Sequence, residues 1–219
     1  IISLGSILFA IGFFVINANE GRSYKHHFSL KTAFSEVISI NADRVNLKDK
    51  SRDYEGKLVH LTGHLQVNEP LGDTNYNILL QAVKMRKIVD VYQWHEDYTE
   101  NKFATDESTS RSYFYYKDWN EHLIRSQSFH SLSHQNPTKK PMESKITVAD
   151  KAFIGPFEIS EEAKIKFNTW IDVTSDTKPD DYFIKMHSGA YYHCEELFDP
   201  QIGDIRVRFQ LAGLEGDIY

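Results

Sequence analysis

The densest group of side chains that could carry chemistry lies near the C-terminal end of the chain. It comprises His187, His193, Cys194, Glu195 and Glu196. Imidazole, thiolate and carboxylate groups are the ligands that zinc takes in proteins, but a site needs about four donors that converge. One hypothesis is therefore a metal-dependent hydrolase that uses His187, His193 and Glu195. Residues of this kind on a predicted hairpin are more often exposed, so no metal site is assigned.

A second pair of histidines, His60 and His64, lies in a segment whose alternation and β-branched residues predict a strand. On a strand, residues four apart share a face but lie about 13 Å apart, at roughly 3.3 Å per residue. Two side chains at that distance cannot bind one metal ion. We therefore expect both histidines on the solvent side of the strand.

Sequence motifs of the common enzyme classes are absent. There is no glycine-rich phosphate loop, no G-x-S-x-G and no CxxC motif. The aromatic run that begins at Tyr113 could stack on bases, but the net charge of −6 favours packed cross-strand pairs over a nucleic-acid surface. The sequence assigns no catalytic, cofactor-binding or metal-binding residue. It predicts a protein that is not an enzyme and binds no nucleic acid.

Most of the chain after residue 19 carries the patterns of strands. Alternation and branched or aromatic side chains predict strands near residues 58–66, 83–96, 113–118, 182–186, 191–194 and 204–211. A bent strand is expected over 148–159, which Gly155-Pro156 interrupts. Helices are expected over part of 29–38 and after Ser160, a favourable N-cap residue. Polar stretches at 97–112 and 172–181 are predicted to be loops.

The clearest alternation lies between residues 203 and 213. It places one set of apolar side chains on a single face of a strand, namely Ile205, Val207, Phe209 and Leu211. Arg206 and Arg208 fall on the opposite face. We expect the apolar face to be packed inside the domain, and the two arginines to need water or acidic partners.

The first nineteen residues contain no charged side chain. As a helix they would be about 28 Å long, close to the roughly 30 Å core of a bilayer. A signal peptide has a basic start and a small-residue cleavage site, and a buried core helix shows regular polar positions. Neither pattern is present. The sequence therefore predicts an α+β protein, with a transmembrane helix over 1–18 and a strand-rich mixed domain over 19–219 beside the membrane.

Several stretches occur in an order that points to one family. They are NEGR directly after the apolar segment, EGKLVHLTGHL with EPLGD, VKMRKIVDVYQWHE, YYKDW leading to IRSQSF, HQNP, IGPF and GDIRVRFQLAG. With these stretches the chain resembles LUMA, the transmembrane protein 43 family, over nearly all of 19–215. No single stretch is specific, and the resemblance rests on all of them together.

The resemblance implies a four-span protein of the endoplasmic reticulum and inner nuclear membrane. Its large domain would lie in the lumen, between the first span and the last three. Self-association into a homo-oligomer and partnership with lamins and emerin would make it a scaffold that organises the nuclear envelope. The basic residues Arg22, Lys25 and Lys31 would favour the cytoplasm, but large domains translocate largely regardless of charge. A lumenal ligand- or lipid-binding module is the alternative.

The family topology also makes a positional prediction. The first span would deliver the chain to the membrane surface near Asn17, and the chain would return there soon after Tyr219. The segment GLEGDIY, residues 213–219, suits such an exit, because its two glycines end the last strand. Both ends of the domain should then lie on its membrane-facing side.

Overall fold

The structure is a computed structural model that describes residues 2–45, 54, 56–102, 109–173, 179 and 181–219. It leaves the side chains of residues 2–4, 101, 102 and 109 undescribed. The chain divides into two compact units. The first comprises residues 1–64 with 154–156 and 218–219, and the second comprises 65–153 and 157–217.

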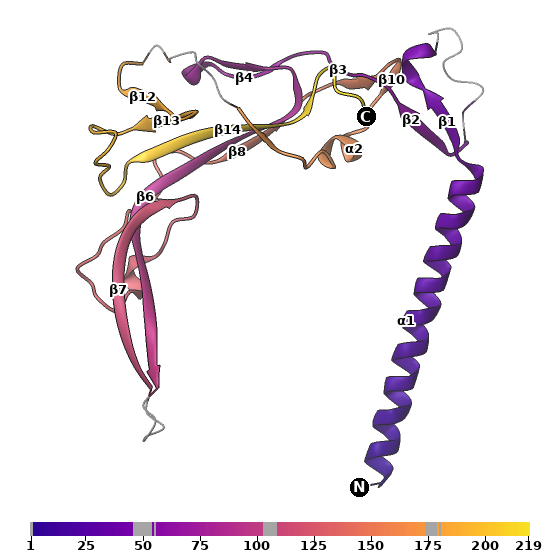
Figure 1. The fold of residues 1–219 in the computed structure, drawn as a ribbon, viewed down its shortest axis with the longest axis horizontal. Coiled ribbons are helices and arrows are strands. Elements are labelled where there is room, and N and C mark those ends of the chain that lie inside the picture. Colours follow the sequence, from indigo (N-terminus) through magenta and orange to yellow (C-terminus); the bar gives the residue numbers. More distant parts are fainter. Residues whose placement is uncertain (1, 46–53, 55, 103–108, 174–178, 180) are drawn as a thin grey trace. The chain divides into compact units, whose positions relative to one another are not determined.

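The first unit begins with one continuous helix, α1, which spans Ile2–Glu36 (Figure 1). The segments predicted to be helical, 1–18 and part of 29–38, are helical wherever the structure describes them, but they belong to one helix and not to two. No proline interrupts the segment, and Gly21 costs a helix only about 1 kcal/mol relative to alanine. Once a helix exists, each further residue adds a hydrogen bond at little cost. Among the residues that the structure describes, no helix meets the combined length and apolarity of a membrane crossing.

A small parallel pair follows the helix in the same unit. Strand β1, Ile38–Asn41, pairs with β2, Val59–Thr62, and the 3-10 turn η1, Ala42–Arg44, follows β1. The chain's last residues join this unit, because the backbone of Tyr219 exchanges hydrogen bonds of 3.0 and 3.1 Å with Gly63. Tyr219 therefore shares a unit with the C-terminal end of α1.

The second unit is built on a seven-stranded sheet. Five of its strands follow the order β12-β13-β14-β6-β7, and the other two pair outside this path, β8 with β6 and β11 with β14. Its strands are β6 Ala82–Lys102, β7 Thr109–Asn120, β8 Lys145–Val148, β11 Ile171–Asp172, β12 Ile184–His187, β13 Ala190–His193 and β14 Ile205–Leu214. Every pairing within this sheet is antiparallel. The strands predicted near 83–96, 113–118, 182–186, 191–194 and 204–211 are all present in this sheet, and β6 and β7 are longer than predicted. The strand predicted over 58–66 is instead divided into β2 and a second strand, Leu65–Val67, of another sheet.

Shorter elements complete the second unit, apart from Ile154, which belongs to the first. A three-stranded sheet has the order β10-β9-β3, with β3 Leu65–Val67, β9 Ala152–Ile154 and β10 Phe157–Glu158. Strands β4 Leu71–Asp73 and β5 Ile78–Leu80 flank the turn η3, Thr74–Tyr76, and a second turn, η4, spans Ser126–Ser128. The short helix α2, Glu161–Ile165, begins as predicted, because the Ser160 side chain accepts the backbone N–H of Ala163.

The core of the second unit lies on one face of the sheet. Ile205, Val207, Phe209 and Leu211 are all buried on this face, as their alternation predicted. Tyr76 and Tyr191 pack there with Phe209, at ring centroid distances of 5.1–6.0 Å. The strand-rich α+β class is confirmed.

The predicted loop over 97–112 was wrong wherever the structure describes it. Strands β6 and β7 pair without interruption from Val91↔Asn120 to Lys102↔Thr109, and they form a long hairpin (Figure 1). The sequence lacks apolar alternation there because both faces of the hairpin end carry polar or exposed side chains. Residues 103–108 lie outside the described part. Of the second predicted loop, Asp172 lies in β11, and 174–178 and 180 are outside the described residues.

Candidate functional site

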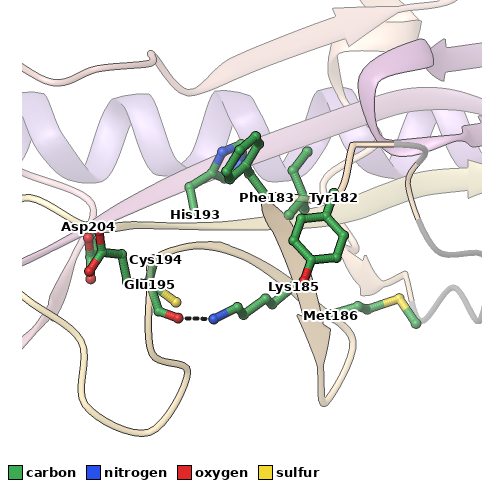
Figure 2. A pocket seen from close by; sticks show the side chains of 9 residues that line it. Tyr182, Phe183, Lys185, Met186, His193, Cys194, Glu195 and Asp204 are labelled. Atoms are coloured by element: carbon green, nitrogen blue, oxygen red, sulfur yellow. Dashed lines mark hydrogen bonds between the residues drawn. The ribbon is translucent and has the colours of Figure 1, made fainter.

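A cavity of about 910 Å³ lies beside the hairpin formed by β12 and β13 (Figure 2). The tight turn of this hairpin is Ser188-Gly189, where both residues adopt positive φ angles of 49° and 73°. Apolar and aromatic side chains line most of the cavity, and a few polar groups stand among them. The lining residues are Tyr182, Phe183, Ile184, Lys185, Met186, His193, Cys194, Glu195 and Asp204. This volume and mixture are typical of sites that bind small molecules.

His193 is the polar group that the structure positions most firmly. It ends β13, which is held between β12 and β14, and its Nε2 lies 3.0 Å from the Tyr76 hydroxyl. Burial lowers the pKa of His193, although the charge of Asp181 acts in the opposite direction. Burial also raises the pKa of Tyr76. Both groups are therefore neutral near pH 7, and one hydrogen bond joins them, its direction set by the tautomer of His193.

A second, smaller cavity of about 380 Å³ shares Ile184 and His193 with the first. Tyr76, Met142 and Asp181 contribute to its lining. The Tyr76 hydroxyl lies 3.5 Å from the sulfur of Met142 and is held by the aromatic core behind it. His193 is thus the common wall of two cavities.

Cys194 lines the first cavity but is not an activated nucleophile. Burial raises the pKa of its thiol, and the charges of Asp204 and Glu196 raise it further against the opposing effect of Lys185. The thiolate is the reactive form of cysteine, so a raised pKa lowers reactivity. The Lys185 amine donates to the backbone carbonyl of Glu195 (Figure 2). The geometry therefore favours binding over nucleophilic chemistry.

The three residues of the hydrolase hypothesis do not come together. His193 faces Tyr76, His187 packs its ring edge against Phe198 at 5.6 Å, and Glu195 is exposed. Within the described ranges, no group of three or more histidine, cysteine, aspartate or glutamate side chains is close enough to hold a metal ion.

His60 and His64 were expected together on the solvent side of one strand. His60 is exposed on β2, as expected. His64 follows the end of β2, and its Nδ1 lies 2.8 Å from Asp43 Oδ2. Two hydrogen bonds with His64 lower the pKa of Asp43, and the one from the His64 backbone N–H has the larger effect. His64 therefore holds the β2 end to η1, which the sequence did not indicate.

A buried carboxylate on the other face of the large sheet was also missed by sequence reasoning. Asp90 is 2% exposed and lies 2.9 Å from Arg206 and 3.0 Å from Arg208. The Arg206 guanidinium also lies over Trp119, 5.2 Å from the ring centroid. The expectation that these arginines need water or acidic partners is confirmed, and Asp90 is the partner. The register Arg206↔Asp90 brings it there.

The aromatic run of β7 forms cross-strand pairs, as predicted. Tyr92 and Trp119 face each other with ring centroids 5.1 Å apart, and Tyr98 and Tyr113 do so at 5.9 Å. Aromatic pairs of this kind contribute about 0.5–1.5 kcal/mol beyond their buried area. They stabilise the hairpin of β6 and β7.

Comparisons with known proteins point in one direction. The family model described as Transmembrane protein 43 matches residues 91–218. A Transmembrane protein 43 homolog of Drosophila melanogaster is 39% identical over 220 residues, which cover 98% of this chain and 58% of that protein. Transmembrane protein 43 of Homo sapiens is 32% identical over 218 residues, which cover 98% of this chain and 54% of that protein. The chain thus spans little more than half the length of these relatives. No solved structure matches it significantly.

Proposed function

The chain belongs to the transmembrane protein 43 family, and on that basis we propose that it is a membrane-anchored, non-enzymatic scaffold protein that self-associates. Its place would be the endoplasmic reticulum and the inner nuclear membrane. Residues 1–18 would hold it in the bilayer, and residues 19–219 would lie in the lumen. Lamins and emerin are the partners that the family resemblance proposes.

The first half of α1 is the observation that carries the membrane anchor. Its large apolar side chains from Ile7 to Ile16 are each more than half exposed: Ile7, Leu8, Phe9, Ile11, Phe13, Phe14, Val15 and Ile16. Successive residues on a helix point about 100° apart, so this set surrounds the helix. A helix that is apolar on all sides is stable when it is buried all round. The lipid bilayer supplies such an environment.

The apolar segment of the proposed anchor includes Ile1 and the side chains of residues 2–4, which lie outside the described part. Beyond residue 19 the helix carries Glu20, Arg22, Lys25 and Lys31. These charges would place residues 20–36 outside the hydrocarbon core, as a rigid stem of roughly 25 Å at 1.5 Å per residue. Strand β1, which begins two residues after Glu36, would then start at the far end of that stem.

The membrane anchor and the side of the membrane can be tested in one preparation. The chain would be expressed with microsomes and treated with alkaline carbonate, and a matched sample would be treated with protease. We expect the wild-type chain to stay in the membrane pellet and residues 19–219 to resist protease until detergent is added. A Phe9→Lys/Phe13→Lys variant should be extracted by carbonate, whereas an Asn17→Lys variant at the predicted end should remain. Extraction of the wild-type chain would refute the anchor, and digestion without detergent would refute the lumenal side.

Self-association is tested separately by crosslinking the chain in mild detergent over a range of concentrations. Species larger than a monomer are expected, in amounts that rise with protein concentration. A chain that stays monomeric throughout would remove the main support for a scaffold.

The cavity beside β12 and β13 favours a second proposal, a ligand- or lipid-binding role. Its lining is mostly apolar, and the neutral ring of His193 can form a hydrogen bond with one polar group of an amphiphile. A fluorescent fatty acid would serve as the probe, added to detergent-purified chain. Phe183→Lys should abolish its saturable binding, whereas Phe198→Lys, a change at an exposed aromatic residue that does not line the cavity, should leave binding unchanged. Equal binding by both variants would refute this role.

A further inference from the structure

Strand β7 has one edge paired with β6 and one edge that faces away from the sheet. The direction of each backbone group follows from β6. The N–H of Tyr92 donates to Asp204 and its carbonyl accepts from Gly203, both on the β14 side. Since backbone groups alternate in direction along a strand, the even-numbered residues of β6 point away from β7 there. Their cross-strand partners on β7 therefore direct their own N–H and C=O groups outward, and these partners are Tyr113, Tyr115, Lys117 and Trp119.

The two outer edges of the β6–β7 hairpin differ in whether their backbone groups are hydrogen-bonded. On β6, beyond the end of β14, Asn136 closes the edge: its Oδ1 accepts the Trp94 N–H at 2.7 Å, and its Nδ2 donates to the Trp94 carbonyl at 2.9 Å. Among the described residues, no hydrogen bond reaches the outward backbone groups of Tyr113, Tyr115 or Lys117. An open edge of this length is a template for another strand, and proteins ordinarily cap or cover such edges.

We propose that this open edge of β7 pairs antiparallel with β7 of a second copy, across a two-fold axis at Tyr115. The inference rests on the proposed self-association and names the surface that produces it. Tyr115 would exchange two backbone hydrogen bonds with Tyr115 of the second copy. The pairing joins two β6–β7 hairpins into one continuous four-stranded sheet, which is an isologous interface as two-fold symmetry requires.

Cross-strand pairs favour this register over its two neighbours. With the axis at Tyr115, residue n faces residue 230 − n of the second copy, so Lys117 faces Tyr113 and Asp118 faces Ser112. No like charges meet. Moving the axis to Phe114 would place Lys117 opposite Arg111, and like charges directly opposite each other destabilise a strand pair. Moving it to Tyr116 would place Asp118 opposite Phe114, so that a charged side chain would replace the aromatic partner that Phe114 has with the axis at Tyr115.

The same register brings exposed aromatic rings together. Phe114 and Tyr116 are 46% and 45% exposed on one face of the hairpin, and the His95 ring stacks on Tyr116 with centroids 5.0 Å apart. In the proposed pair, each Phe114 faces Tyr116 of the second copy, which makes two aromatic cross-strand contacts. Such pairs are among the favourable ones in sheets. The interface therefore supplies both backbone hydrogen bonds and apolar burial.

A disulfide across the axis tests the register. The experiment uses the full chain in mild detergent, in a Cys194→Ser background, with Ser112→Cys and Asp118→Cys combined. Residues 112 and 118 face each other only between copies, at a position where opposite Cβ atoms lie about 4.5–5.5 Å apart, close to disulfide distance. We expect a covalent dimer on mild oxidation of the double variant. Each single cysteine variant is the matched control and should remain monomeric on denaturing gels.

A proline variant tests the edge without any crosslink. Lys117→Pro removes an outward N–H that β6 does not use, whereas Lys117→Ala keeps that N–H and removes the side chain that lies over Trp94. Proline should abolish self-association in mild detergent, and alanine should preserve it. A matching thermal unfolding curve for the two variants shows that the hairpin itself is intact.

The outcomes separate this inference from the proposed function. Self-association that survives Lys117→Pro, or an absence of covalent dimer in the double variant, would overturn the β7 interface and leave the scaffold role standing. A wild-type chain that is monomeric at all concentrations would overturn both. A covalent dimer in the double variant alone, with loss of association in Lys117→Pro, supports the interface.

Discussion

Replacing Asp90 by asparagine should destabilise the domain more than any other change of a single charge on the large sheet. Asp90 is held between two guanidinium groups on β14, at 2.9 and 3.0 Å, and its side chain is 4% exposed. Asparagine keeps the volume but removes the charge. It also turns an amide N–H₂ toward at least one guanidinium group, which can only donate.

The magnitude follows from the burial of the three groups. Removing one partner of a fully buried ion pair costs about 3–5 kcal/mol. The side chains of Arg206 and Arg208 remain 24% and 38% exposed, so water screens part of the uncompensated positive charge. We therefore expect Asp90→Asn to lower the free energy of unfolding by about 2–3 kcal/mol.

The measurement is urea unfolding of the full chain in detergent micelles, followed by tryptophan fluorescence, since Trp119 lies on Arg206. Asp172→Asn on the neighbouring β11 is the control: it keeps an acceptor for Gln210, and its cost should stay within about 0.5 kcal/mol. In an Arg206→Met background, Asp90→Asn should cost less, because one of the two unpaired charges is gone. A cost below about 1 kcal/mol for Asp90→Asn would refute the view that this carboxylate fastens β6 to β14.

Three further predictions concern the described core and turns. Tyr76→Phe should lower the free energy of unfolding by about 1–2 kcal/mol, because it leaves His193 Nε2 without its hydrogen-bond partner, and urea unfolding at pH near 7.5 would measure this. Burial lowers the pKa of His193 in the folded chain. As the pH falls through about 6.5, the ordinary pKa of histidine, the unfolded chain therefore takes up a proton before the folded chain does, and the free energy of unfolding decreases. The stability difference between pH near 7.5 and pH near 5.5 should therefore be smaller in His193→Gln than in the wild type, and an unchanged difference would contradict this account. Gly155→Ala should cost at least about 2 kcal/mol, because φ is +56° and a Cβ would lie 2.5 Å from the Ala42 carbonyl oxygen. Gly216→Ala, where φ is +86° and no atom lies within 4 Å of the added Cβ, should show the backbone cost alone, and equal costs for the two variants would show that the contact with Ala42 is unimportant.

Local patterns in the sequence were sufficient for most elements. The alternation through Ile205, Val207 and Phe209 predicted both the strand and its buried face, because period 2 reports directly which side of a strand leaves water. Ser160 predicted the start of α2, because a cap acts within one helical turn. The need of Arg206 and Arg208 for water or acidic partners also followed from their place opposite the apolar face.

Two features of the elements themselves were not predicted from the sequence. Helix α1 continues through Glu20, Gly21 and Arg22, because polar residues and one glycine do not stop a helix that has already formed. The hairpin of β6 and β7 continues through polar residues to Lys102↔Thr109. Its stability comes from cross-strand partners such as Tyr98 with Tyr113, which a search for apolar periodicity along one strand does not detect.

The sites belong to the tertiary structure alone. Asp90 meets Arg206 across 116 positions of sequence, and Tyr76 meets His193 across 117. Neighbouring residues such as His187 and His193, which looked like a ligand group in the sequence, face different surroundings on the two strands of one hairpin. The order of strands in the sheet decided these outcomes, including which edge Asn136 closes and which edge of β7 stays open. That order is set by long-range pairing, whereas the periodicity of a sequence reports only how each segment divides its side chains between core and water.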